Sequence, residues 1–403
     1  MKCRSLLFLS LLLAAGQIMA CTSVLVSGKA TKDGRPLLFK NRDTGDLNNL
    51  SVLVQGEKYK YLAIVAAKDL KPNSVWGGHN EAGFAIINTA AYNLNKEDDK
   101  SGGRDGQVMR RALEICATLK DFETMLDTIS RPLGVDSNYG VIDANGGCAY
   151  YETGNNGYVK FDANDPKIAP HGYLVRTNHG FTGDRNMDKG VERFMAITSF
   201  MQETDAAGMI SYDYLITRVP RYLTHGLTKM NLYDFMPADD SQAVFFPFRD
   251  FIPRYQSSST ILVQGVKKGE SPSLTVSWTI VGSPLTTLAI PLCITPSGKL
   301  PSIVTRGADG SSQLCQIGLK LKDELFPVKV SSGTDYINLA KLINKKGTGI
   351  MQLIRPIEQN VISKGAELLD KERQSGKFGK EMDDYYRWVD DYVLQFYKST
   401  FNL

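Results

Sequence analysis

The residue with the clearest potential for chemistry is Cys21, which begins the mostly apolar and β-branched run at residues 21–26. If a peptidase cuts after Ala20, Cys21 carries a thiol and a free α-amine on one residue. The thiolate is the form of cysteine that attacks a carbonyl carbon, and an α-amine with a pKa of about 7.7–8.0 can accept the thiol proton near neutral pH. Cys21 would then be a nucleophile with its own base.

Residues 1–20 have the features of a signal peptide. Lys2 and Arg4 give a basic start, residues 6–15 form an apolar run too short to span a bilayer, and residues 17–20 end in a small residue. No later run reaches about 18 apolar residues, so the sequence predicts no transmembrane segment in the mature chain. We expect an exported protein that is periplasmic or secreted.

The composition excludes one class of partner. The 403 residues include 47 basic and 43 acidic ones, the formal net charge is +4, and the charges form no basic stripe. A nucleic-acid partner is therefore not indicated. A homo-oligomer is compatible with the sequence.

The cysteines and histidines indicate neither a disulfide framework nor a metal site. Of the six cysteines, Cys3 lies in the leader, and the remaining five form no C-x-x-C pair. Cys116 falls on the apolar face of a predicted helix, which is typical of a buried, inert thiol. The four histidines lack ligand spacing, so we expect no metal and no organic cofactor.

A charged cluster is predicted to lie beside Cys21. Residues 22–26 and 36–39 read as the strands of a hairpin with turn formers between them, and Lys40-Asn41-Arg42-Asp43 follows directly. Because the end of one hairpin strand lies near the start of its partner, we expect Asp43 to orient the Cys21 amine. Lys40 or Arg42 would hold the thiolate or a substrate carboxylate. The alternative is a solvated strand end.

The remaining pattern favours an α+β fold, because strands, two helices and further strands follow one another without βαβ alternation. The predicted mature chain divides into a main domain at residues 21–330 and a helical C-terminal extension at 331–403 that packs on it. The elements expected in the main domain are strands at 52–54 and 61–66, a glycine-rich turn from residue 77 into a strand ending at Asn88, helices from about Gln107 and from Asp121 to Ile129, a hairpin around 143–147, a strand from 173 into Asn178, a helix holding Arg193, and strands within 260–294.

Five features in order resemble the cysteine branch of the Ntn-hydrolase superfamily that acts on linear amide C–N bonds. This branch includes the choloylglycine hydrolases, the acyl-CoA:6-aminopenicillanate acyltransferase family and the acid ceramidase-like amidases. The features are Cys21, the element Lys40-Asn41-Arg42-Asp43 in place of the family's Arg-Asn-x-Asp, the stretch Asn80-Glu81-Ala82-Gly83-Phe84-Ala85 followed by Asn88, the pair Thr177-Asn178, and Arg193 before a phenylalanine. Lys40 departs from the family's arginine.

The resemblance implies a four-layer αββα sandwich and a set of roles. It implies that the backbone N–H of Asn88 and the side-chain amide of Asn178 form an oxyanion hole. Asp43 would orient the amine, and Lys40 and Arg193 would set the charge around the thiolate.

The substrate expected from the resemblance is an N-acyl amide, such as an acylated amino acid, a conjugated bile acid or a phenoxyacetyl penicillin. Residues near the oxyanion strand could line an acyl pocket: Trp76, Phe84, Ile86, Ile87 and Tyr92.

Three alternatives remain open. The spacing from Cys21 to Asp43 also resembles the cysteine dipeptidases of the same superfamily. An acyltransferase would hand the acyl group to an amine rather than to water. Finally, Ile18-Met19-Ala20-Cys21 approximates a lipobox, which would make the protein a non-catalytic lipoprotein, anchored at the cell surface through a lipidated Cys21.

Overall fold

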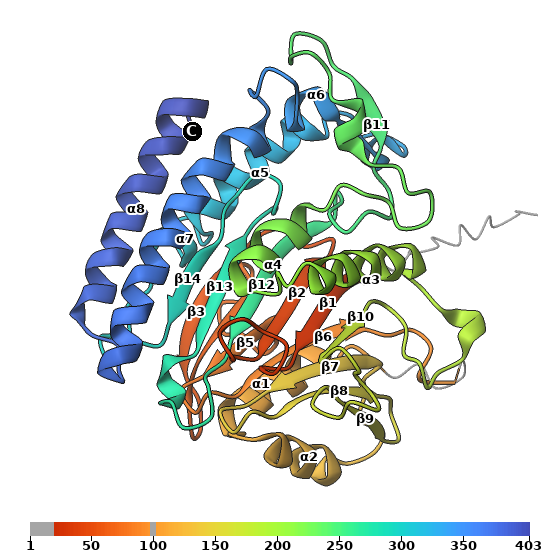
Figure 1. Cartoon of the computed structure of the whole chain (residues 1–403), viewed down its shortest axis with the longest axis vertical. Coiled ribbons are helices and arrows are strands. Elements are labelled where there is room, and N and C mark those ends of the chain that lie inside the picture. Colours follow the sequence, from red (N-terminus) through yellow and green to blue (C-terminus); the bar gives the residue numbers. More distant parts are fainter. Residues whose placement is uncertain (1–19, 97–101) are drawn as a thin grey trace, which may run out of the picture.

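The computed structural model describes residues 20–96 and 102–403, and two antiparallel sheets form its centre (Figure 1). In spatial order, the six-stranded sheet consists of β10 (Tyr173–Arg176), β1 (Ala20–Val26), β2 (Leu37–Asp43), β12 (Ser257–Gln264), β13 (Val276–Val281) and β14 (Ile290–Cys293). The seven-stranded sheet consists of β3 (Asn49–Gln55), β4 (Lys60–Ala66), β5 (Gly77–Asn80), β6 (Ala85–Ala90), β7 (Ser137–Ile142), β8 (Cys148–Thr153) and β9 (Tyr158–Asp162). The predicted hairpin is confirmed as β1 and β2.

The two sheets face each other across an apolar layer. Leu25 and Leu38 of one sheet share a buried cluster with Ile64 and Ile87 of the other. Alternate residues of these strands point away from this layer, as the period of two in a strand requires. Each sheet therefore has a second face to cover.

Helices α1 (Asp105–Ile115) and α2 (Leu119–Thr128) cover the outer face of the seven-stranded sheet, where Val108 and Phe122 join the cluster that holds Phe84 and Ile86. The predicted start of α2 was wrong by a few residues. Thr118 is its N-cap, and Asp121 occupies the third helical position of a capping box, so its carboxylate still satisfies a backbone N–H at this helix start.

The outer face of the six-stranded sheet is covered by helices from residue 191 onward. Trp278 and Ile280 of β13 lie in one buried cluster with residues of α3 (Val191–Ala206), α4 (Tyr212–Arg218), α5 (Gln313–Leu325), α7 (Ile350–Ser375) and α8 (Lys380–Phe401). The order of layers is helix, sheet, sheet, helix, which confirms the predicted αββα sandwich.

The C-terminal helical extension is present, with α7 and α8 side by side at one edge of Figure 1. Tyr386 of α8 accepts a hydrogen bond from the Cys293 N–H of β14, and Tyr397 donates one to the Thr286 carbonyl. A short helix, α6 (Leu339–Leu342), and a separate two-stranded pair, β11 (Phe245–Pro247) with β15 (Tyr336–Asn338), complete this end. The domain boundary at residue 331 stays a prediction.

The expected glycine-rich turn at residue 77 is instead strand β5. A Cβ on Gly78 would lie 2.1 Å from the Leu62 carbonyl oxygen of β4, so only glycine lets the two backbones approach this closely. The glycines serve strand packing, and the turn follows them.

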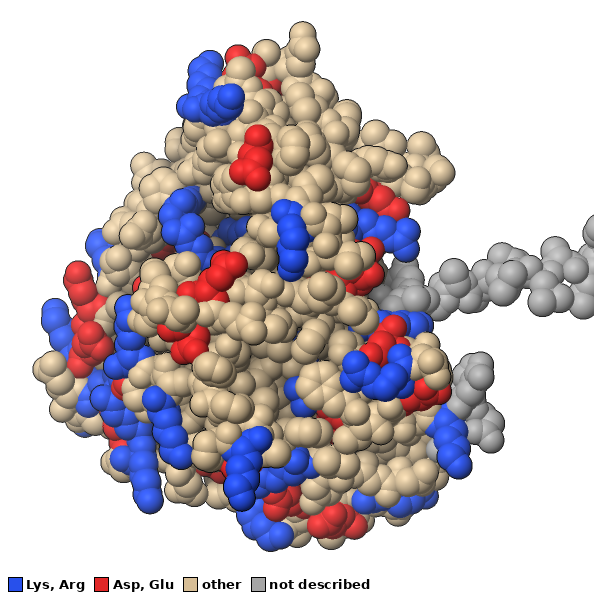
Figure 2. Space-filling model, turned by 45° about the vertical axis from the view of Figure 1, so that its right-hand side comes forward, with Lys and Arg blue, Asp and Glu red and all other residues tan. Residues whose placement is uncertain are grey.

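None of the helices in the described part of the chain has the length and hydropathy to cross a bilayer. On the face drawn in Figure 2, basic and acidic side chains are interspersed. This agrees with the absence of a basic stripe in the sequence.

Candidate active site

The β1–β2 register brings Cys21 to the charged cluster. Cys21 pairs with Arg42, and Ala20 pairs with Asp43. All four residues are buried, Cys21 with 2% and Asp43 with 0% of their surface exposed. The predicted proximity of the cysteine to the cluster is therefore present in the structure.

The backbone of Cys21 is held by Asn178 and Arg193. The Cys21 N–H donates to Asn178 Oδ1 at 3.0 Å, and Arg193 Nη2 donates to the same oxygen at 2.7 Å. Arg193 Nη1 donates to the Cys21 carbonyl and, at 3.2 Å, to Thr22 Oγ1. Asn178 Nδ2 in turn donates to the Ala90 carbonyl at 2.7 Å. This contact between Asn178 and the nitrogen of Cys21 was not anticipated from the sequence.

Gly190 makes room for the arginine. It is the N-cap of α3, has φ of +70°, and a Cβ built on it would lie 2.3 Å from Arg193 Nη2. Glycine adopts this left-handed conformation without strain. The start of α3 thus places the guanidinium against Cys21.

Lys40 joins the two sheets near Cys21. Its ammonium donates to the Trp76 carbonyl at 2.6 Å and to Asn88 Oδ1 at 2.7 Å, and Asn88 Nδ2 donates to Ser137 Oγ at 3.0 Å. Burial lowers the pKa of Lys40 to about 7, and neighbouring Arg42 acts in the same direction while Cys21 opposes it. The structure therefore brings together Lys40 and Asn88, two of the predicted site residues.

The depressed pKa of Lys40 predicts a pH-dependent stability. Between pH 7 and 10.5 the unfolded chain binds a proton on Lys40 that the folded chain has lost, so this residue's contribution to stability rises with pH. Relative to Lys40→Met, the wild type should gain up to roughly 1.4 kcal/mol in unfolding free energy per pH unit across this window. Urea unfolding at several pH values measures this. The control is the exposed Lys120→Met variant, which keeps Lys40 and should show the wild-type rise in unfolding free energy with pH. If its profile is as flat as that of Lys40→Met, the prediction is wrong.

Asp43 is bound by groups far along the chain. Arg254 Nε donates to Asp43 Oδ2 at 2.8 Å, and Ser257 Oγ donates to Oδ1 at 2.6 Å. Burial alone would lower the pKa of Arg254, but the charge and hydrogen bond of Asp43 raise it. No local signal marked Arg254, which reaches Asp43 because β12 pairs with β2.

Four basic side chains lie near the thiol. Lys40, Arg42, Arg193 and Arg254 all lie close enough to Cys21 for a thiolate there to favour their charged forms. Burial, followed by repulsion from Arg254, lowers the pKa of Arg193 to about 10. The Arg42 guanidinium stacks 4.2 Å from the Trp76 ring centroid. Such a positive environment is typical of reactive cysteines.

The other thiols within residues 20–96 and 102–403 are in a different environment. Burial raises the pKa of Cys116 and Cys293 to about 12 and that of Cys315 to about 11, and it raises the pKa of Cys148 as well. All five cysteines of these ranges are free. The prediction that Cys116 is buried is confirmed, although it follows α1 as its C-cap.

A buried carboxyl near the cluster was missed by the sequence analysis. Asp105, the first residue of α1, is 8% exposed, and burial raises its pKa to about 7. Its charge opposes the loss of the Lys40 proton. A polar residue at a helix start reads as ordinary capping, so nothing in the local pattern singled it out.

The expected apolar wall is only partly near the site. Phe84 and Ile86 point to the helices α1 and α2, away from Cys21, because their side chains alternate with that of Ile87 along β6. Trp76, against Arg42, and Tyr92 lie near the nucleophile. Burial raises the pKa of Tyr92, and a charge on Cys21 would raise it further. Among the residues that the structure describes, no group of His, Cys, Asp or Glu side chains is arranged to hold a metal ion.

Comparison with known proteins identifies one family. Residues 30–213 match the family model described as acyl-coenzyme A:6-aminopenicillanic acid acyl-transferase, a range that contains Lys40, Asp43, Asn88, Asn178 and Arg193. This match confirms the resemblance predicted from the motifs. A search of curated protein sequences gives no match.

Similar solved structures are distant. A mutant of conjugated bile acid hydrolase from Clostridium perfringens is 10% identical with a TM-score of 0.39, and the alignment covers 68% of this chain and 92% of that one. Penicillin V acylase from Agrobacterium tumefaciens is 11% identical, with a TM-score of 0.35 and coverages of 68% and 86%. The Caenorhabditis elegans ortholog of N-acylethanolamine-hydrolyzing acid amidase is 17% identical, with a TM-score of 0.33 and coverages of 48% and 86%. Likenesses this distant say nothing about the substrate of this chain.

Proposed function

We propose, from the match of residues 30–213 to the acyl-coenzyme A:6-aminopenicillanic acid acyl-transferase family model, that this chain hydrolyses N-acyl amides with the thiol of Cys21. The observation that carries the proposal is the set of contacts around Cys21. Its backbone is held by Asn178 and Arg193, and basic side chains lie near its thiol. The protein is proposed to act after export, in the periplasm or outside the cell.

The proposed reaction has two stages. The Cys21 α-amine takes the thiol proton, the sulfur attacks the amide carbonyl carbon, and the backbone N–H of Asn88 and the side-chain amide of Asn178 stabilise the negative oxygen. The C–N bond then breaks as the Cys21 ammonium protonates the leaving amine. Water attacks the thioester, and the carboxylic acid leaves while the thiol and the amine are restored.

The position of Ala20 supports a role for Asp43 in this reaction. Ala20 pairs with Asp43 in the register, so a cut after Ala20 would expose the new amine at the end of β1, next to that carboxylate. Asp43 is fixed by Arg254 and Ser257, which leaves its carboxylate little freedom to turn. It is thus suited to orient the amine.

A mature chain that starts at an unmodified Cys21 is the first expectation, because the thiol and the amine must both be free. Intact-mass analysis of the protein purified from its native host measures this directly. A mass that includes a diacylglyceryl adduct would instead establish the lipoprotein alternative and end the proposal.

The substrate test compares two classes of amide. We expect turnover of N-acyl amides over free dipeptides, because a dipeptidase must bind a free substrate terminus whereas an amidase mainly needs an apolar pocket for the acyl group. Acylated amino acids, a conjugated bile acid and phenoxyacetyl penicillin are assayed beside a dipeptide panel at equal enzyme concentration. Dipeptide cleavage without N-acyl amide turnover would identify a dipeptidase.

The matched family is named for acyl transfer, so an acyltransferase is the second candidate. The same assay with an added amine distinguishes the two activities. A transferase forms a new amide at the expense of the free acid, whereas a hydrolase yields the acid throughout.

A further inference from the structure

We propose that Glu152, Arg176 and Asn138 position Asn178 for catalysis, an inference that rests on the proposed function of Asn178 as an oxyanion donor. None of the three contacts Cys21 in the structure as described. They fix the backbone on both sides of Asn178, so they act through it as positioning residues.

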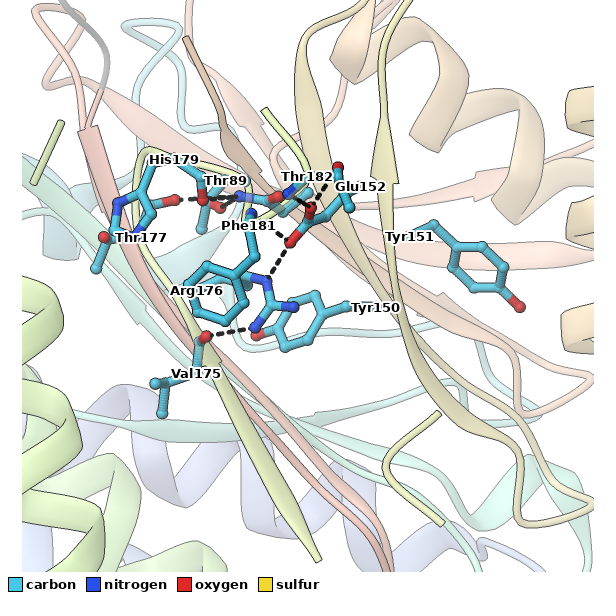
Figure 3. Close-up of polar contacts among 12 residues, drawn as sticks. Thr89, Tyr150, Tyr151, Glu152, Val175, Arg176, Thr177, His179, Phe181 and Thr182 are labelled. Carbon is cyan, nitrogen blue, oxygen red and sulfur yellow. Dashed lines mark hydrogen bonds and ion pairs between the residues drawn. The ribbon is translucent and has the colours of Figure 1, made fainter. Parts of the chain in front are cut away.

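The first part of this framework is a buried ion pair (Figure 3). Arg176 Nε lies 3.0 Å from Glu152 Oε1, and the two side chains are 1% and 0% exposed. The guanidinium also donates to the Val175 carbonyl at 2.9 Å. It is enclosed by aromatic rings, with centroids 4.1 Å away for Phe181, 4.8 Å for Phe161 and 5.2 Å for Tyr150.

Glu152 binds the chain on the far side of Asn178 as well. Its Oε1 accepts from the Phe181 N–H at 2.9 Å, and its Oε2 accepts from the Thr182 N–H at 2.9 Å and the Thr182 hydroxyl at 2.7 Å. One carboxylate on β8 therefore holds both Arg176, two residues before Asn178, and the segment that begins three residues after it (Figure 3).

Asn138 holds the two carbonyls next to Asn178. Its Nδ2 lies 3.2 Å from the His179 carbonyl and 3.4 Å from the Thr177 carbonyl. The same nitrogen donates to Thr89 Oγ1 at 3.0 Å, and Thr89 follows Asn88 on β6. Asn138 thus ties the two proposed oxyanion donors to one point of β7.

Stability alone does not account for these groups. A buried ion pair is costly to desolvate, and apolar residues of similar volume often stabilise a core equally well. Directional hydrogen bonds hold the backbone around Asn178 in one position, which apolar packing alone does not do. Because a misplacement of about 1 Å can cost roughly 100-fold in rate, a fixed backbone has a direct kinetic value.

The test is Glu152→Gln, which keeps the size of the side chain and removes its charge. We expect kcat to fall roughly 10- to 100-fold with KM nearly unchanged. The displaced side-chain amide of Asn178 would no longer stabilise the transition state, while binding of the substrate would be retained. The rate at which iodoacetamide alkylates Cys21 should fall far less than kcat, because Arg193 still holds the Cys21 carbonyl. This second readout separates a displaced oxyanion donor from a damaged nucleophile.

The chain offers a matched control in its other buried Arg–Glu pair. Arg221 Nη2 lies 2.8 Å from Glu358 Oε1, the side chains are 8% and 3% exposed, and neither residue contacts the proposed site. Glu358→Gln should lower the melting temperature about as much as Glu152→Gln and leave kcat intact. Equal loss of kcat in both variants would show a purely structural effect and overturn the inference.

Two further variants apply if Glu152→Gln does not fold. Asn138→Ser shortens the side chain that binds the two carbonyls, and Arg176→Lys keeps the charge. Both should lower kcat far more than the alkylation rate, the lysine less than the serine. Wild-type kcat in both would overturn the inference. Failure of the proposed function itself is recognised separately, since the wild-type enzyme would then turn over no N-acyl amide.

Discussion

Mature protein with serine in place of Cys21 should lose at least about 10³-fold in kcat on N-acyl amides. A hydroxyl is far harder to deprotonate than a thiol, so the α-amine removes its proton far less readily. Steady-state kinetics with a chromogenic N-acyl anilide measure the loss.

Cys116→Ser is the control for this substitution. Cys116 is fully buried and its pKa is raised to about 12, so it takes no part in the proposed reaction. We expect a lower melting temperature, from burying a hydroxyl group, and an unchanged kcat. If Cys21→Ser retained wild-type turnover, the nucleophile would have to be sought elsewhere.

The second large effect is expected for Asn178→Asp, at roughly 10²- to 10³-fold in kcat. The aspartate oxygen can still accept from the Cys21 N–H and from Arg193, so the amino terminus keeps its anchor. The donor on Nδ2 is lost, a carboxylate oxygen faces the Ala90 carbonyl, and a negative charge stands at the proposed oxyanion site. Kinetics and thermal unfolding are measured on the same preparation.

Asn344 provides the matched control. It is also fully buried, and its Nδ2 donates to the Ala340 carbonyl at 3.0 Å, remote from Cys21. Asn344→Asp should destabilise the fold by a comparable amount and spare kcat. A similar kinetic defect in both variants would mean that Asn178 contributes to stability and not to chemistry.

The local parts of the fold were predictable because they follow from neighbouring residues. Alternating apolar residues and a turn define the β1–β2 hairpin, and the hairpin alone places Cys21 near the 40–43 cluster. The helical stripes on α1 and α8 follow from their period in the same way. The family motifs then indicated Asn88, Asn178 and Arg193.

The parts that escaped prediction depend on distant pairing. Arg254 reaches Asp43 only because β12, more than 200 residues later, pairs with β2. Gly77 and Gly78 looked like a turn because the sequence alone does not show how closely the backbone of β4 approaches the backbone of Gly78. The Asn178 contact with the Cys21 nitrogen depends on where β10 lies in the sheet.

The Ala20–Cys21 bond belongs to a strand, and this has a consequence for timing. Ala20 is 3% exposed and Cys21 2%, so in the folded chain this bond lies out of reach of a separate peptidase, which needs an extended, accessible segment. A cut after Ala20 would therefore have to precede folding, or Cys21 itself would have to take part in it. While the bond is intact, the nitrogen of Cys21 is an amide nitrogen, which cannot accept the thiol proton. A folded precursor would therefore be an inactive form of the proposed enzyme.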